Sequence, residues 1–179
     1  MRTKLRVILA ALLVLAALAA CNKEEEYAEP EAFSFVVYPG ARYLGQLTEA
    51  TKNAHKTMAP NQEPPPTAIY DTEASVEEVA QFYAKSYGYS GVAPDATNNL
   101  SAAKPPAYYR TGDLAGDVKA IEPITKQLGL NTDVTKAVGS YRAADITPRP
   151  NRPRVTIQRP YFDVTTSQVV DRTLVLMTR

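Results

Sequence analysis

Three basic residues, Arg2, Lys4 and Arg6, precede an uninterrupted apolar run of fourteen residues from Val7 to Ala20. A basic start, an apolar stretch of this length and small residues at its end are typical of a secretory signal. The run is too short for a membrane-spanning helix, which needs roughly 20 apolar residues. We therefore expect residues 1–20 to be a cleaved signal peptide, with an uncleaved anchor as the alternative, so the fold must be built from the rest of the chain.

The apolar run closes with Leu18-Ala19-Ala20-Cys21, which places the only cysteine of the chain directly after two small residues. This tetrapeptide resembles the lipobox of bacterial lipoproteins. The resemblance implies that the thiol of Cys21 receives a diacylglyceryl group, that the chain is cut before it, and that the freed amine is often acylated too, for example by palmitate. Two or more acyl chains hold a protein durably on a bilayer. The residue after the cysteine is Asn22. In enterobacterial lipoproteins an aspartate at this position favours the inner membrane, so the resemblance implies the outer membrane here.

Loss of the signal peptide changes the charge balance. The whole chain carries 20 basic and 19 acidic residues, and removal of three basic residues leaves 17 against 19, a net charge of −2. A near-neutral chain has no general attraction for nucleic acid, so we expect no nucleic-acid partner. With Cys21 consumed by lipid, no disulfide can form within the chain, and stability must come from burial.

The mature chain divides into two parts. Residues 21–32 consist of the cysteine and the segment NKEEEYAEPEA, which is charged and has almost nothing to bury. Such a segment is expected to be a flexible acidic tether. The 147 residues at 33–179 are within the usual size of one domain, and no internal repeat is visible. We therefore expect a single domain behind the tether.

Alternating apolar patterns and turn residues predict both strands and helices in this domain. The helix over 75–87 is the best defined, because Ser75 and Glu78 form a capping-box pattern and Gly88 follows its end. Pro123 should kink or break the helix expected over 113–128. The other expected elements are a short helix at 134–138, a short helix or mostly loop over 49–66, and strands at 33–38, 42–47, 67–71, 107–111, 154–159 and 172–178.

The last two of these strands should pair antiparallel through the loop at 161–171. The pattern as a whole predicts an α+β fold, with a single mainly antiparallel sheet of about five or six strands and two or three helices packed on one side. The segments YPGA (38–41) and SVEEVAQFY (75–83) resemble those of small uncharacterised bacterial lipoproteins. That resemblance implies one α+β domain behind a lipid anchor, and it brings no catalytic residues with it.

Most catalytic constellations are excluded by the residues present. A hydrolytic triad or dyad needs a histidine as proton relay, and the only one is His55, in the expected loop. No nucleophile elbow, phosphate loop or dinucleotide fingerprint occurs. Zinc sites normally take several Cys and His ligands. We therefore expect no catalytic, cofactor-binding or metal-binding residues, and Cys21 is the one site residue, as the point of lipid attachment.

Carboxylate chemistry is the exception, because a glycosidase needs only two suitably spaced acids. Asp113 and Asp117 share a helical face, and Asp163 and Asp171 bracket a loop that is also a candidate for calcium. Helix capping and loop solvation are the ordinary explanations of these pairs. The alternative function of the chain is therefore a carboxylate-dependent hydrolase or transferase that acts on envelope polymers.

Two sets of side chains are candidates for binding. Tyrosines gather at Tyr87/Tyr89 and Tyr108/Tyr109, where the choice lies between packing and stacking on sugar rings. From Tyr141 onward there are seven arginines and no lysine; these arginines either contact anionic headgroups, phosphates or an acidic protein, or protect strand edges. The sequence favours a membrane-anchored envelope lipoprotein without enzymatic activity, a binding or assembly module whose partner is an envelope protein or cell-wall component.

Overall fold

The computed structural model describes residues 37–95 and 104–179. The expected signal peptide, Cys21, the acidic tether and most of the strand expected at 33–38 lie outside the described residues. The last two residues of that expected strand are irregular chain, and they lead into a turn at Gly40, which has φ +74°. Glycine adopts this left-handed conformation without strain.

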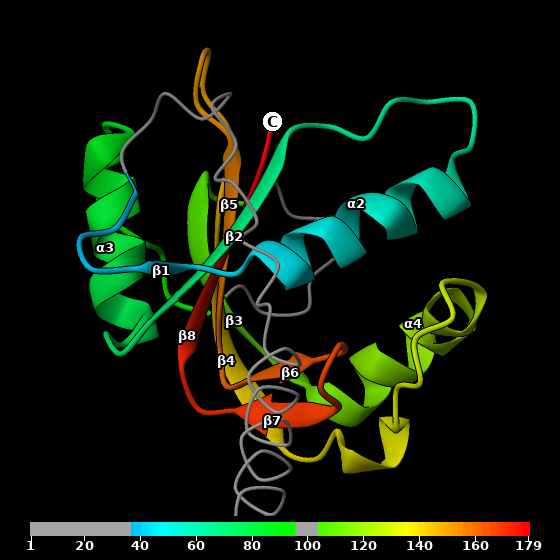
Figure 1. Cartoon of the computed structure of the whole chain (residues 1–179). Coiled ribbons are helices and arrows are strands. Elements are labelled where there is room, and N and C mark those ends of the chain that lie inside the picture. The colour runs from blue at the N-terminus through cyan, green and yellow to red at the C-terminus, as the bar shows by residue number, and fades with distance from the viewer. Residues whose placement is uncertain (1–36, 96–103) are drawn as a thin grey trace, which may run out of the picture.

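Six strands form one fully antiparallel sheet in the order β1-β2-β8-β5-β4-β3 (Figure 1). Arg154 pairs with Thr178, which confirms the predicted antiparallel pairing of the last two strands. The strands are β1 (Arg42–Tyr43), β2 (Thr67–Thr72), β3 (Ala107–Asp113), β4 (Ser140–Ile146), β5 (Arg154–Arg159) and β8 (Thr173–Thr178).

The described residues also form a separate two-stranded ladder, three α-helices and one short 3-10 helix. The fold class is therefore confirmed as α+β with a single main antiparallel sheet of six strands. These elements are β6 (Tyr161–Asp163), β7 (Gln168–Val170), α2 (Gly45–Met58), α3 (Val76–Ser86), α4 (Leu114–Gln127) and η1 (Val134–Lys136).

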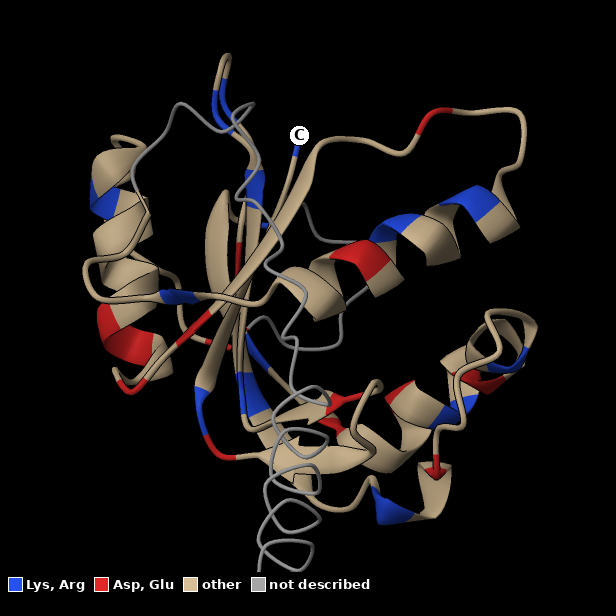
Figure 2. Cartoon of the chain, in the orientation of Figure 1, with Lys and Arg blue, Asp and Glu red and all other residues tan. Residues whose placement is uncertain are grey.

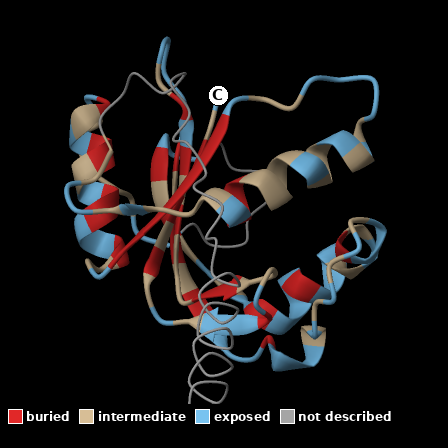
Figure 3. Ribbon diagram, viewed as in Figure 1, coloured by how far each residue is buried: buried red, intermediate tan, exposed pale blue. Residues whose placement is uncertain are grey.

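The helix α3 covers one face of the sheet (Figure 1). Its apolar side carries Val79 and Tyr83, which are 0% and 1% exposed, as its helical periodicity predicts. Figure 3 shows this side of α3 as buried and its outer side as exposed. The sheet contributes alternate residues to this core, namely Ala68, Tyr70, Ala144, Ile146, Val155, Ile157, Val175 and Met177.

Two helices, α2 and α4, lie together on the opposite face of the sheet. Leu47 of α2 packs on Ile69, and Leu114 of α4 packs with Tyr141. The ring of Tyr141 lies so close to β3 that a Cβ at Gly112 would be 2.2 Å from it, so any larger residue there would force this ring to move. The sequence predicted two or three helices on one side of the sheet, and α2 and α4 do lie on one side. It did not predict that α3 covers the opposite face.

Several element boundaries differ from the sequence predictions. The strand expected at 42–47 is shortened to the two residues of β1, because the helix α2 begins at Gly45. The hydroxyl of Thr48 in the first turn of α2 donates to the Leu44 carbonyl (2.9 Å) and accepts from the Ile69 amide of β2 (3.1 Å). The expected loop at 161–171 contains the β6–β7 ladder. The strand β4 was not predicted. Pro123 was expected to kink or break its helix; α4 continues through it, so the break does not occur.

Candidate anion-binding site

The chain between β4 and β5 forms a proline-rich tip that extends beyond the sheet (Figure 1). The Arg152 amide donates to the Arg149 carbonyl at 2.9 Å, and Asn151 between them has φ +61°. Pro150 at the first central position and a positive φ at the second are the pattern of a type II turn, in which asparagine is tolerated. The turn therefore places Arg149 and Arg152 opposite each other on the two arms of the tip.

The end of α3 lies beside this tip and presents two tyrosines to it. Gly88 has φ +73°, its amide donates to the Lys85 carbonyl (3.0 Å), and the Tyr89 amide donates to the Ala84 carbonyl (2.9 Å). This hydrogen-bond pair is a Schellman motif, which reverses the chain directly after a helix. The motif places Tyr87 and Tyr89 on either side of the capping glycine.

Each of these tyrosines holds one arm of the tip. The Tyr89 hydroxyl donates to the Thr147 carbonyl at 3.0 Å on the first arm, and the Tyr87 hydroxyl donates to the Pro153 carbonyl at 2.9 Å on the second. Burial raises the pKa of Tyr87 to about 12, so its hydroxyl keeps its proton and remains a donor over the whole physiological range. The two hydrogen bonds fix the position of the tip on the body of the domain.

The same two rings also carry the two arginines of the tip. The guanidinium carbon of Arg149 lies 4.5 Å from the centre of the Tyr89 ring, and that of Arg152 lies 5.2 Å from the centre of the Tyr87 ring. A cation over an aromatic face is held there by the ring quadrupole. Stacking on a ring uses no N–H group of the guanidinium, so the N–H groups of both arginines remain available to donate hydrogen bonds to an oxyanion.

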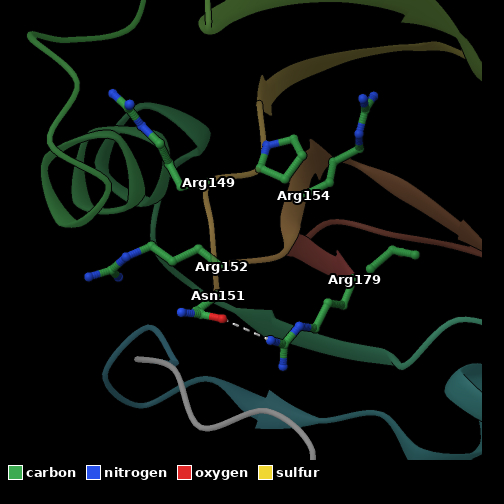
Figure 4. Close-up of a pocket in the computed structure, with 7 residues that line it drawn as sticks. Arg149, Asn151, Arg152, Arg154 and Arg179 are labelled. Atoms are coloured by element: carbon green, nitrogen blue, oxygen red, sulfur yellow. Dashed lines mark hydrogen bonds between the residues drawn. The ribbon is translucent and has the colours of Figure 1, made fainter.

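Two further arginines complete what we call the arginine cluster, defined as Arg149, Arg152, Arg154 and Arg179. Together with neighbouring backbone they line an open depression of about 380 Å³. Figure 4 shows that Arg149 and Arg152 point to one side, that Arg154 points away from them, and that Arg179 reaches toward the Asn151 side chain (3.3 Å). The guanidinium groups spread over the tip instead of converging on one point.

The arginine cluster is not neutralised by the part of the chain that the structure describes. None of its four members forms an ion pair with a described acidic residue, although Arg42, Arg110, Arg142, Arg159 and Arg172 all do. Basic residues are visibly concentrated at the tip in Figure 2. The cluster therefore has both the charge and the free donors that an anionic group requires.

The aspartates singled out by the sequence have structural contacts in α4 and its neighbours. Asp113 caps α4 by accepting from the Gly116 amide at 2.8 Å, as expected for a helix cap. Asp117 accepts from the Tyr141 hydroxyl. The pair therefore supports the first turn of the helix.

The second pair of aspartates is also occupied by local contacts. Asp163 accepts from the Thr165 amide (2.8 Å) and hydroxyl (2.6 Å), which forms an Asx turn. Asp171 accepts from the Arg159 guanidinium at 2.8 Å, and this hydrogen bond lowers the pKa of the Asp171 carboxyl. A general acid requires a raised pKa, so the direction of this shift does not favour acid catalysis.

Three further sequence expectations concern a histidine, metal ions and membrane spans. His55 lies on α2 and not in a loop, so that expectation is wrong. Within 37–95 and 104–179, no group of three His, Cys, Asp or Glu side chains is arranged to hold a metal ion. None of the helices in these two ranges has the length and apolar character needed to span a bilayer.

Two of the four clustered tyrosines serve packing, one of the two explanations that the sequence offers for them. Tyr87 and Tyr109 are only 6% and 8% exposed, so their faces are not available to sugars. Edge protection does not explain the C-terminal arginines, because β5 and β8 are interior strands of the sheet.

The sequence did not predict that Tyr87 and Tyr89 contact the arginines of the tip. The Arg-Pro-Asn-Arg turn and the two tyrosines around Gly88 were the available signals.

Comparison of the chain with protein-family models, with curated protein sequences and with solved structures found no match. The functional argument therefore rests on the geometry and chemistry of the arginine cluster.

Proposed function

We propose that this chain is a bacterial envelope lipoprotein, anchored by lipid on Cys21, whose folded domain is a non-enzymatic module that binds a phosphate-bearing envelope component through the arginine cluster. The signal peptide and lipobox pattern support the anchor, and Asn22 favours the outer membrane. The proposed partner is an anionic cell-wall or membrane component on the same side of the membrane as the domain.

The observation that carries the binding function is the stacking of Arg149 on Tyr89 and of Arg152 on Tyr87, with no described acidic partner for either arginine. Long side chains lose rotamer freedom when they bind. Here the rings hold both guanidinium groups before a ligand arrives, so less freedom is lost on binding. The planar fork of arginine matches the oxygens of phosphate.

The enzymatic alternative has weaker support from the geometry. Each of the four candidate acids has a structural contact. Asp113 caps a helix and Asp117 accepts from a tyrosine hydroxyl. Asp163 forms a turn and Asp171 pairs with an arginine. A carboxylate hydrolase instead requires two acids that face one substrate across a set gap. Binding is the function that the described residues support best.

Phosphate titration of the mature chain, purified in a non-ionic detergent, tests the binding function. Inorganic phosphate is the probe, and NMR shifts of the tip residues are the readout. We expect the double variant Arg149→Gln/Arg152→Gln to weaken phosphate binding about tenfold or more, because each charge-assisted hydrogen bond contributes about 1.5–3 kcal/mol. Both side chains lie at the tip, so the fold should persist.

A matched control removes two positive charges elsewhere. Lys56 on α2 and Lys119 on α4 are exposed and have no ion pair with a described residue. The double variant Lys56→Gln/Lys119→Gln should leave phosphate affinity unchanged. If both double variants weaken binding equally, the effect comes from net charge and the proposed site is wrong.

The anchor has a separate test. Mass spectrometry of the N-terminal peptide from membrane-derived protein should show a chain that begins at Cys21 and carries acyl groups. A free thiol at Cys21, or a chain that still begins at Met1, would contradict the anchor and leave the binding function to be judged on its own.

A further inference from the structure

The arginine cluster continues onto the other side of the tip through Arg154. This residue lines the depression of the arginine cluster and also a second depression of about 210 Å³. The second depression is formed by the beginning of β3 and the end of β4, and it includes Lys104, Tyr108 and Asp145. One cation is therefore shared by two neighbouring hollows on the same end of the sheet.

Lys104 repeats the arrangement seen in the arginine cluster. Its ammonium group lies 5.4 Å from the centre of the Tyr108 ring, and it has no ion pair with any acidic residue in the described ranges. Three cations on this end of the sheet, Arg149, Arg152 and Lys104, thus lie over tyrosine rings. Each has its charge free for an external anion.

The acid in the second depression does not oppose an anion strongly. Asp145 accepts from the Arg110 guanidinium at 2.7 Å and from the Thr156 hydroxyl at 3.0 Å. Both oxygens of its carboxylate are therefore engaged, and the positive charge of Arg110 compensates its own. The charge left over in this hollow is that of Lys104 and Arg154.

We propose that the ligand of this surface is an extended polyanion, a chain of linked phosphate groups that contacts both depressions, with Arg154 between them and Lys104 at the far end. The inference rests on the proposed function and names the class of ligand. The cations of this surface are divided between two depressions, and the guanidinium groups in Figure 4 point in different directions. A ligand with several linked phosphates fits such an arrangement, since its phosphates can contact different cations at the same time.

Titration with two inorganic probes tests the inference: phosphate, and tripolyphosphate as the linked form. The mature chain should bind tripolyphosphate more tightly than phosphate. Lys104→Gln should weaken tripolyphosphate binding about threefold, the effect of one exposed ion pair, and leave phosphate binding unchanged. Arg154→Gln should weaken both. Lys104→Arg, which keeps the charge, should restore tripolyphosphate affinity, and Lys56→Gln is the single-charge control on α2.

The outcomes separate the inference from the proposed function. Equal affinity for the two probes, or a Lys104→Gln variant that binds tripolyphosphate like the parent chain, overturns the extended ligand while the Arg149 and Arg152 site remains. Loss of phosphate binding on Lys104→Gln also overturns it, because the two hollows then act as one. If Arg149→Gln/Arg152→Gln changes neither probe, the proposed function itself is wrong.

Discussion

Arginines lie at both ends of the six-stranded sheet, and their surroundings differ. At the end away from the tip, Asp71 is fully buried. Its carboxylate accepts from the Arg42 guanidinium at 2.8 Å and from the Tyr161 hydroxyl at 3.2 Å, and it lies 3.0 Å from the Arg172 guanidinium. At the tip, the arginine cluster has tyrosine rings and no described acid. Arginine therefore joins parts of the fold at one end and presents free charge at the other.

This difference shows why a count of charges says little about function. Without residues 1–20 the chain has a net charge of −2, which suggests no preference for anions. Five other arginines form ion pairs with described acids, whereas the arginines of the tip form none. Local pairing, and not composition, decides which charges are available to a partner.

Breaking the buried network should have the largest effect on stability. Asp71→Ala removes the carboxylate shared by Arg42, Arg172 and Tyr161, and we expect the free energy of unfolding to fall by about 2 kcal/mol, because the buried Tyr161 hydroxyl and the largely buried Arg172 guanidinium lose their acceptor. Urea unfolding measures the change. A loss well below 1 kcal/mol would mean that water replaces the carboxylate and that the two ends of the sheet are alike.

The contact of Tyr87 with the tip should have an intermediate effect. Tyr87→Phe deletes the hydrogen bond to the Pro153 carbonyl but keeps the ring under Arg152, and we expect a loss of about 1 kcal/mol in urea unfolding. The Arg152 stack should persist, so phosphate affinity should change less than in the Arg149→Gln/Arg152→Gln variant. Equal losses of affinity in the two variants would assign the binding effect to the position of the tip and not to its charge.

The same variant makes a prediction about alkaline pH. Burial raises the pKa of Tyr87 to about 12, whereas a tyrosine in an unfolded chain titrates near ~10. Between these values only the unfolded chain loses the proton, so rising pH favours unfolding. The contribution is complete below about pH 10 and disappears as the pH rises through about 12. Unfolding midpoints of Tyr87→Phe should therefore fall less steeply over this range; parallel curves would contradict the shift.

The smallest effect on stability is expected at the tip itself. Arg149→Gln should change the free energy of unfolding by about 0.5 kcal/mol or less, the worth of an exposed cation over a ring, while it weakens phosphate binding. Urea unfolding and phosphate titration of the same preparation measure the two effects. A large loss of stability would place Arg149 with the arginines that support the fold and remove the contrast.

Elements with strong local signals were predictable from sequence. The capping box at Ser75 and Glu78 is present, with the Ser75 amide donating to the Glu78 side chain at 2.8 Å and the Glu78 amide donating back at 3.2 Å. These two hydrogen bonds join residues three apart, so propensity and capping determine them. The helix α3 was accordingly predicted correctly. The alternating patterns of β5 and β8 predicted both strands, and their antiparallel pairing was also predicted correctly.

Elements that depend on distant contacts were not predictable in the same way. The tip is held by hydrogen bonds between residues 66 and 58 positions apart in the chain, and no local pattern reveals such a contact. The strand β4 escaped prediction because Ala143 and Ala144 lack the β-branched side chains typical of strands. The start of α2 depends on Thr48 meeting β2, a tertiary contact that overrides the local preference.

The prolines of the tip have a consequence for how the domain resists proteases. Arg149 and Arg152 are each followed directly by proline. The peptide bond after each of them has no N–H group, and cleavage after arginine by trypsin-like enzymes is poor at such bonds. The tip can therefore expose basic side chains on a protruding loop without offering an easy point of cleavage.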